Sequence, residues 1–229
     1  MDNLLTISNM WFSPESVSIM KRESDNFILK DISLSLVRGE KLGIGGNSGS
    51  GKTTLAKIIA GILKPQKGKI WYSPEIDFNR KANPIQLLFQ NSEEIINPYR
   101  KTGDILIEAL QIEHKLNREE LDKELEHLCK TLLIEQDVLN KKGYQLSGGQ
   151  RQRIAMARLW AVKPQILILD EPVSAQDVES QANLSSLLST ITVSQNVSLI
   201  VISHNRKVLE KVSDRIIELS NGAIISNNF

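Results

Sequence analysis

The chain has 229 residues, 41% of them hydrophobic and 24% charged, as is ordinary for a globular protein of one domain, with or without a modest insertion. The net charge of +1 argues against a dominant nucleic-acid-binding face, and a lone cysteine, Cys129, excludes a disulfide framework and a cysteine metal cluster. The N-terminus lacks a signal peptide and no apolar run approaches the roughly 18 residues that cross a bilayer, so we expect a cytoplasmic protein that meets a membrane only through a partner.

The first part of the chain predicts strands around a glycine-rich loop. Residues 4–8 and 32–37 alternate enough to form strands, and the polar stretch 13–26 between them predicts a loop or a weak hairpin. Residues 41–45 predict a short buried strand. After the loop, apolar residues at i, i+3, i+4 and i+7 indicate a helix that stops at Lys64-Pro65. Those apolar residues are Leu55, Ile58, Ile59 and Ile62.

The loop between that strand and that helix, Gly46 to Thr53, fits the phosphate-binding pattern G-x-x-x-x-G-K-[ST] in full. Glycines allow successive backbone N–H groups to curl round a phosphate, and the N-terminus of the helix adds partial positive charge. Lys52 can reach the β- and γ-phosphates, and the Thr53 hydroxyl can ligate Mg²⁺. We therefore predict a nucleoside triphosphate bound by Gly46, Asn47, Ser48, Gly49, Ser50, Gly51, Lys52, Thr53 and Thr54.

The remainder of the chain alternates apolar strands with helices, which predicts a mostly parallel α/β sheet. The helical stretch 91–162 looks like an insertion between two strands of that sheet, so that residues 1–90 and 163–229 form the rest of a single domain. The strands expected are 70–72, 85–89, 166–169, 199–202 and a hairpin within 215–225, and the helices expected are 103–112, 118–133, 151–160 and about 178–190.

Polar residues follow three of the apolar strands, at the sheet edge where ligands of open α/β sheets bind. Asp170 can hold Mg²⁺ directly or through water, and Glu171 can face a water in line with the γ-phosphate. Gln90 can accept from that water and donate to a phosphate or metal-bound oxygen. Taken singly, each of these residues also has an ordinary structural interpretation: the acids and the glutamine could be solvated, and His204 could be a satisfied core histidine. The phosphate loop earlier in the chain favours the functional interpretation.

A second anion site of backbone N–H groups is predicted where Ser147, Gly148, Gly149 and Gln150 begin a helix. The stretch Leu146 to Gln150 resembles the signature of the ATP-binding cassette (ABC) family, and the resemblance extends from about Leu4 to Ile225. It implies a P-loop NTPase with a RecA-like mostly parallel sheet, an N-terminal antiparallel β portion and an inserted α-helical subdomain.

The resemblance also assigns roles to single residues. Gln90 matches the Q-loop glutamine, Glu171 the catalytic glutamate, Asp177 the D-loop aspartate and His204 the switch histidine, while residues 46–53 match the Walker A loop. The cofactors implied are ATP and Mg²⁺, with Thr53, Gln90 and Asp170 at the metal. In this family each ATP lies between the Walker A loop of one cassette and the signature of another, so that ATP binding closes a dimer and hydrolysis releases it.

Three positions depart from the family pattern. Gln176 stands where the D-loop usually has leucine, and Asn205 stands where an acid usually follows the switch histidine. Pro14 occupies about the place of the aromatic residue that often stacks on adenine, with Trp11 and Phe12 nearby, so the stacking residue stays open. None of these departures removes a catalytic group, and we expect an active ATPase.

The stretch from Gln90 to Pro98 looks like the corresponding stretch in importers of oligopeptides, dipeptides and nickel, and the length resembles the second ATPase of nickel or metal–opine importers. The partners implied are a second ATP-binding subunit (a different chain or a second copy), two transmembrane permeases and an extracytoplasmic binding protein, with no nucleic acid. The chain would then lie at the cytoplasmic face of the cell membrane. The alternative is the ATPase of a separate-cassette exporter, or an ABC ATPase outside transport.

Overall fold

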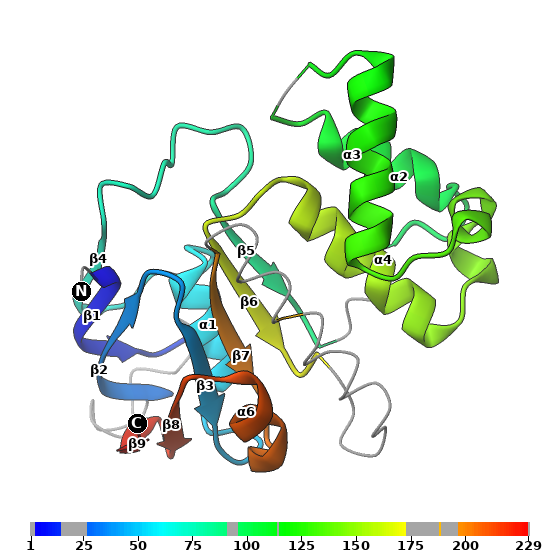
Figure 1. Ribbon diagram of the computed structural model, residues 1–229. Coiled ribbons are helices and arrows are strands. Elements are labelled where there is room, and N and C mark those ends of the chain that lie inside the picture. Colours follow the sequence, from blue (N-terminus) through cyan, green and yellow to red (C-terminus); the bar gives the residue numbers. More distant parts are fainter. Residues whose placement is uncertain are drawn as a thin grey trace.

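The computed structural model describes residues 3–14, 27–90, 96–113, 115–172, 188 and 197–228. Its strands form two sheets, and the helices α2, α3 and α4 lie together beyond the β5 and β6 side of the larger sheet (Figure 1). Among the helices that the structure describes, none combines the length and the apolar character that a membrane span requires.

The smaller sheet is antiparallel, in the order β2-β1-β4, and is made of β1 (Asn3–Phe12), β2 (Leu29–Val37) and β4 (Lys67–Tyr72). Each strand is longer than the sequence pattern predicts. In β1 and β2 the cause is an irregularity at Asn9 and Asp31, which both adopt positive φ and whose side chains are joined by a 2.9 Å hydrogen bond. The irregularity breaks the alternation on which the prediction depended, while pairing continues beyond it.

The larger sheet has the order β5-β6-β7-β3-β8-β9, and all of its neighbouring strands run parallel except β8 and β9. The mostly parallel sheet predicted from the sequence is therefore confirmed. The predicted hairpin turn is confirmed too, because Asn221 and Gly222 both have positive φ. The strands are β3 (Lys41–Gly45), β5 (Ile85–Leu88), β6 (Ile166–Asp170), β7 (Ser198–Ile202), β8 (Arg215–Ser220) and β9 (Ala223–Asn228).

Helix α1 (Lys52–Ile59) ends earlier than predicted. Gly61 has a φ of 75°, and the N–H of Ile62 donates to the carbonyl of Lys57, a hydrogen-bond pattern that terminates helices. Ile62 therefore lies beyond the helix and is 55% exposed, so its inclusion among the apolar positions of that helix was wrong. The apolar periodicity continues past Gly61, so it did not predict that the helix ends there, about one turn before Pro65.

The other helices are α2 (Thr102–Leu110), α3 (Arg118–Thr131), α4 (Gly148–Ala161) and α6 (Arg206–Val212), with short 3₁₀ turns at Gln136–Asn140 and Gly143–Gln145. Helices α2, α3 and α4 were predicted and are confirmed, whereas α6 was not predicted. The polar helix expected near 178–190 falls outside the described residues except at Leu188. Helices α2 to α4 all lie within the stretch 91–162, whose status as a separate subdomain remains a prediction.

The core lies on both faces of the larger sheet, since successive residues of a strand point to opposite faces. Ile166 and Ile168 of β6 pack in one cluster with α1 and the smaller sheet. Leu167 and Leu169 pack in the other cluster with α4, α6 and the buried residues of α3, Leu128 and Cys129. Strands β6 and β7 are buried throughout, which explains why their sequences are continuously apolar.

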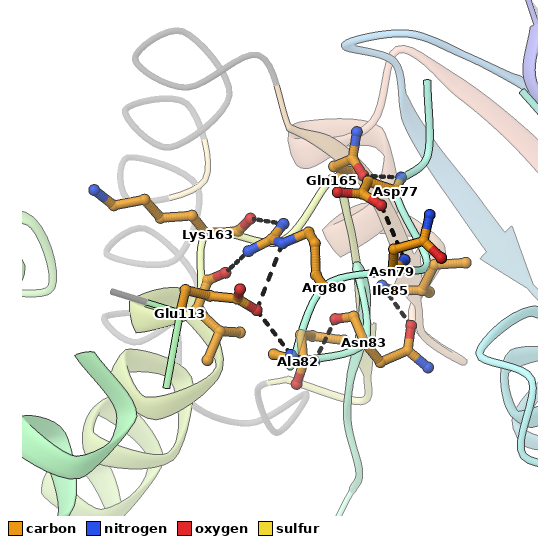
Figure 2. A network of polar contacts seen from close by, with 11 residues as sticks. Asp77, Asn79, Arg80, Ala82, Asn83, Ile85, Glu113, Lys163 and Gln165 are labelled. Carbon is orange, nitrogen blue, oxygen red and sulfur yellow. Dashed lines mark hydrogen bonds and ion pairs between the residues drawn. The ribbon is translucent and has the colours of Figure 1, made fainter. Parts of the chain in front are cut away.

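A polar network joins the helices to the sheet at the amino ends of β5 and β6 (Figure 2). The guanidinium of Arg80 donates to the carbonyl of Lys163 at 2.9 Å and to the carbonyl of Val162, both just past the C-terminus of α4. Its Nε also forms an ion pair with Glu113 at 3.5 Å, and Glu113 accepts the N–H of Ala82 at 2.7 Å. A cation at these carbonyls complements the helix dipole and fixes the C-terminal end of α4.

Candidate functional site

The carboxyl ends of β3, β5, β6 and β7 surround a cavity of about 670 Å³, a volume within the usual range for small-molecule sites. It brings together residues from the phosphate loop and from three strand ends that are far apart in the sequence. The lining residues are Ile28, Asn47, Ser48, Gly49, Gly51, Lys52, Thr53, Thr54, Gln90, Asp170, Glu171 and His204.

The phosphate loop presents hydrogen-bond donors to this cavity. Helix α1 begins directly after Gly51, and no side chain caps its N-terminus, so its first N–H groups are available to an anion. The Lys52 ammonium donates to the carbonyls of Gly46 at 2.7 Å and Asn47 at 2.9 Å, which directs it into the loop. Gly46 needs to be glycine because its φ is 138° and a Cβ would lie 2.2 Å from the carbonyl oxygen of Leu219. These features fit the phosphates of a nucleotide.

The donor set for a cation is made of oxygens. Thr53 Oγ1 donates to Asp170 Oδ2 at 2.6 Å, and the side chain of Gln90 lines the same cavity. Asp170 is 2% exposed, and this burial raises the pKa of its carboxyl, an effect that the hydrogen bond from Thr53 opposes. One carboxylate with a neighbouring hydroxyl suits Mg²⁺, which is usually held by one or two carboxylates together with phosphate oxygens and water. The residues present therefore fit this ion.

The Glu171 carboxylate is held by donors from the neighbouring strand end. Its Oε1 accepts the backbone N–H of His204 at 2.8 Å and lies 2.8 Å from His204 Nδ1. Its Oε2 accepts the hydroxyl of Ser203 at 3.2 Å. Glu171 itself has a φ of 50°, in the left-handed region, and its N–H donates to the carbonyl of Ile202. The residues that match the catalytic glutamate and the switch histidine of the family pattern are thus in direct contact.

Sequence reasoning missed Ser203 and Ile28. Ser203 carries a hydroxyl between an apolar strand and a histidine, but only the adjacency of β6 and β7 brings it to Glu171. Ile28 lines the cavity, whereas the candidates for adenine stacking do not: Trp11 packs edge-on against Phe27 at 5.2 Å and Phe12 lies in the core. The unusual Asn205 has a local role, since its side chain accepts the N–H of Lys207 at 3.0 Å and begins α6.

The signature residues do not line the cavity. Ser147 and Gln150 form a capping box at the start of α4, in which the Ser147 hydroxyl accepts the N–H of Gln150 at 3.3 Å and Gln150 Oε1 accepts the N–H of Ser147 at 3.1 Å. A Cβ at Gly149 would meet no neighbouring atom within 4 Å in the part of the chain that the structure describes, so this face of the helix is open there. Asp177, the predicted D-loop aspartate, lies outside the described residues.

Comparison with known proteins identifies relatives over nearly the whole chain. The ABC transporter family model matches residues 29–174, more than half of the chain. The oligopeptide transport ATP-binding protein OppF of Haemophilus influenzae is 34% identical over 197 residues, which are 82% of this chain and only 59% of that protein. The nickel import ATP-binding protein NikE of Escherichia coli is 31% identical over 229 residues, 97% of this chain and 85% of that protein.

Two solved structures share the fold. A dimeric post-hydrolysis state of the ATP-binding cassette MJ0796, bound to ADP and Pi, superposes with a TM-score of 0.81 at 26% identity, covering 98% of this chain and 97% of that one. The cassette cbiO1 from Clostridium perfringens, part of the ABC transporter complex cbiONQ, superposes with a TM-score of 0.82 at 26% identity, covering 100% of this chain and 89% of that one. The predicted P-loop fold class is thereby confirmed.

Proposed function

The chain belongs to the ABC transporter family as an ATPase cassette, and from this premise we propose that it powers an importer of peptides, nickel or a chelated metal. The observation that carries the proposal is a single cavity that combines Lys52, the Thr53–Asp170 pair and the Glu171–His204 pair. A phosphate-binding lysine, an oxygen donor set for Mg²⁺ and a carboxylate next to a histidine are the groups that phosphoryl transfer to water requires.

Each of these groups has a distinct role in the proposed hydrolysis. Lys52 and the N–H groups of the phosphate loop bind the β- and γ-phosphates, and Thr53, Asp170 and Gln90 hold Mg²⁺, which neutralises phosphate charge when bound. Glu171 accepts a hydrogen bond from the attacking water, because an ionised carboxylate has about four acceptor sites and still has capacity beyond Ser203 and His204. His204 contacts Glu171 and lines the same cavity, where it would act on the γ-phosphate.

The active site is completed by a second cassette in this proposal. Ser147, Gly148 and Gly149 at the N-terminus of α4 do not line the chain's own cavity, and Gly149 is uncovered among the described residues. Backbone N–H groups there, with Asp177 nearby in the family pattern, would contact a nucleotide held mainly by the partner cassette. The second cassette is a different chain or a second copy of this one, and ATP binding closes the dimer.

The transport partners would be two permeases and an extracytoplasmic binding protein, which place the chain at the cytoplasmic face of the membrane. Support comes from the stretch from Gln90 to Pro98 and from similarity to proteins named for oligopeptide and nickel transport. We assign permease docking to the helical stretch, where α2 and α4 border a groove of about 170 Å³. It is lined by Asn97, Arg100, Ile105, Glu108, Ala109, Ile112 and Arg158.

A capture experiment tests this assembly. Tagged Glu171→Gln protein is purified from native cells with ATP, because loss of the base should hold the cassettes closed, and its partners are identified by mass spectrometry. Lys52→Ala is the matched control, since it should not bind the nucleotide that closes the dimer. Two permeases, a second ATPase and a binding protein would support the importer. Permeases without a binding protein would favour an exporter, and ribosomal or DNA-bound partners would overturn a transport role.

A further inference from the structure

Ser203 lies directly after β7, next to the strand that leads into the phosphate loop. Its N–H donates to the carbonyl of Ile44 in β3 at 3.2 Å, and the residue is only 3% exposed. The backbone of Ser203 is therefore tied to the central strand of the sheet. Its side chain starts from a fixed point beside the cavity.

The direction of the Ser203 hydroxyl proton follows from its two partners. A serine hydroxyl has one proton to donate and two lone pairs to accept with. The N–H of Asn205 donates to Ser203 Oγ at 3.1 Å, and Glu171 Oε2 lies 3.2 Å from the same oxygen. An ionised carboxylate can only accept, so the hydroxyl proton is directed to Glu171.

Both oxygens of Glu171 are thus fixed by consecutive residues of one segment. Ser203 binds Oε2 while the backbone N–H of His204 binds Oε1 at 2.8 Å. We infer that Ser203 is a positioning residue for Glu171: it does not contact the nucleotide, and it holds the plane of the carboxylate that faces the attacking water. This inference rests on the role of Glu171 proposed above. Small misplacements of a catalytic group are costly, since about 1 Å can reduce a rate by 10²-fold.

The same strand offers a matched control. Ser198 is the first residue of β7, at the opposite end of the sheet from the cavity, and it is also fully buried. Its hydroxyl accepts the N–H of Gly39 at 2.8 Å and donates to the carbonyl of Val37 at 3.3 Å. Ser198→Ala therefore removes a buried hydroxyl with two partners, as Ser203→Ala does, without touching Glu171.

The test compares three variants, Ser203→Ala, Ser203→Thr and Ser198→Ala, each in the whole chain within its assembled complex. For each variant, kcat and KM for ATP and the thermal unfolding temperature are measured. Ser203→Ala should lower kcat by about 10-fold and leave KM within about twofold of the wild-type value. This loss of kcat is smaller than the 10²–10⁴-fold that a positioned base contributes, because the base is displaced and not removed. Ser203→Thr, which keeps the hydroxyl, should restore most of the turnover. Ser198→Ala should keep the wild-type kcat, although its unfolding temperature should shift by about as much as that of Ser203→Ala.

A Glu171→Gln background separates this inference from the proposed function. There, Ser203→Ala should cause no further loss in the residual single-turnover rate, because the carboxylate that it positions is already gone. Wild-type turnover in Ser203→Ala beside an inactive Glu171→Gln would overturn the positioning role and leave the ATPase proposal intact. Wild-type turnover in Glu171→Gln would overturn both. An equal loss of kcat in Ser198→Ala, or no rescue by threonine, would reduce Ser203 to a structural residue.

Discussion

Thr53 at the start of α1 and Asp170 at the end of β6 are joined by a 2.6 Å hydrogen bond between hydroxyl and carboxylate. The bond ties the phosphate loop to the strand that carries the acidic pair, across 117 positions of the sequence. It also keeps the exposed Thr53 hydroxyl beside Asp170, whose carboxylate is buried and therefore costly to keep ionised.

Asp170→Asn should stabilise the nucleotide-free protein at neutral pH. Burial raises the pKa of Asp170 above its ordinary value of 3.8. The protonated Asp170 side chain therefore stabilises the folded state below pH 3.8, and this stabilisation is lost as the pH rises through the raised pKa. The variant should therefore unfold a few degrees higher at pH 7, and the difference should shrink toward pH 4. Calorimetry at the two pH values checks this. A lower unfolding temperature at pH 7 would contradict it, and Mg²⁺-dependent turnover should be lost in either case.

Lys52→Ala should weaken ATP binding by about 10- to 100-fold, the range that one or two charge-assisted hydrogen bonds supply. The substitution removes the only side-chain donor seen at the carbonyls of Gly46 and Asn47 among the described residues. Isothermal titration with ATP measures the effect. Lys64→Ala, beyond the end of α1 and away from the cavity, is the control, and unchanged affinity in Lys52→Ala would refute the phosphate-loop assignment.

Gly149→Ala should separate folding from assembly. A Cβ at this position meets none of the described residues within 4 Å, and alanine is a better helix former than glycine by about 1 kcal/mol, so unfolding should not become easier. ATP binding to the chain's own loop should also persist, whereas turnover of the assembled complex should fall because the open face of α4 is altered. Gly143→Ala provides the contrast. Its Cβ would lie 2.7 Å from the carbonyl of Asn97, and that variant should be less stable.

Arg80→Ala should lower the free energy of unfolding by about 2 kcal/mol, because it removes the Arg80–Glu113 pair and the hydrogen bonds of the network in Figure 2. This loss lies between those typical of exposed and of buried ion pairs, since the side chains of Arg80 and Glu113 are 18% and 13% exposed. For a chain of this size that corresponds to roughly 4–8 °C in thermal unfolding. Lys123→Ala, which breaks an exposed pair with Glu119, should change the unfolding temperature little. A similar small change in Arg80→Ala would show that the network does not stabilise the fold.

The parts of the site that could be predicted are those written in contiguous residues. Gly46 to Gly51 forms a loop between β3 and α1, and Asp170 and Glu171 lie at the end of the buried strand β6, because each arrangement depends on local pattern. Ser203 could not be assigned, since its contact with Glu171 depends on which strands are neighbours in the sheet. Helix α6 was missed because its seven residues are held by the Asn205 cap and by burial of Val208, Leu209 and Val212 rather than by a long periodic pattern.

The position of β3 between β7 and β8 has a consequence for biosynthesis. The strand that leads into the phosphate loop spans residues 41–45, yet its two parallel neighbours span residues 198–202 and 215–220. A ribosome delivers the N-terminal part first, and pairings between such distant segments form slowly. Leu42 and Ile44, fully buried in the finished fold, stay without these neighbours until residues 198–220 have emerged. We therefore expect nucleotide to stabilise this protein only after synthesis has passed these residues, and a nascent chain stalled before Ser198 should gain no protection from ATP.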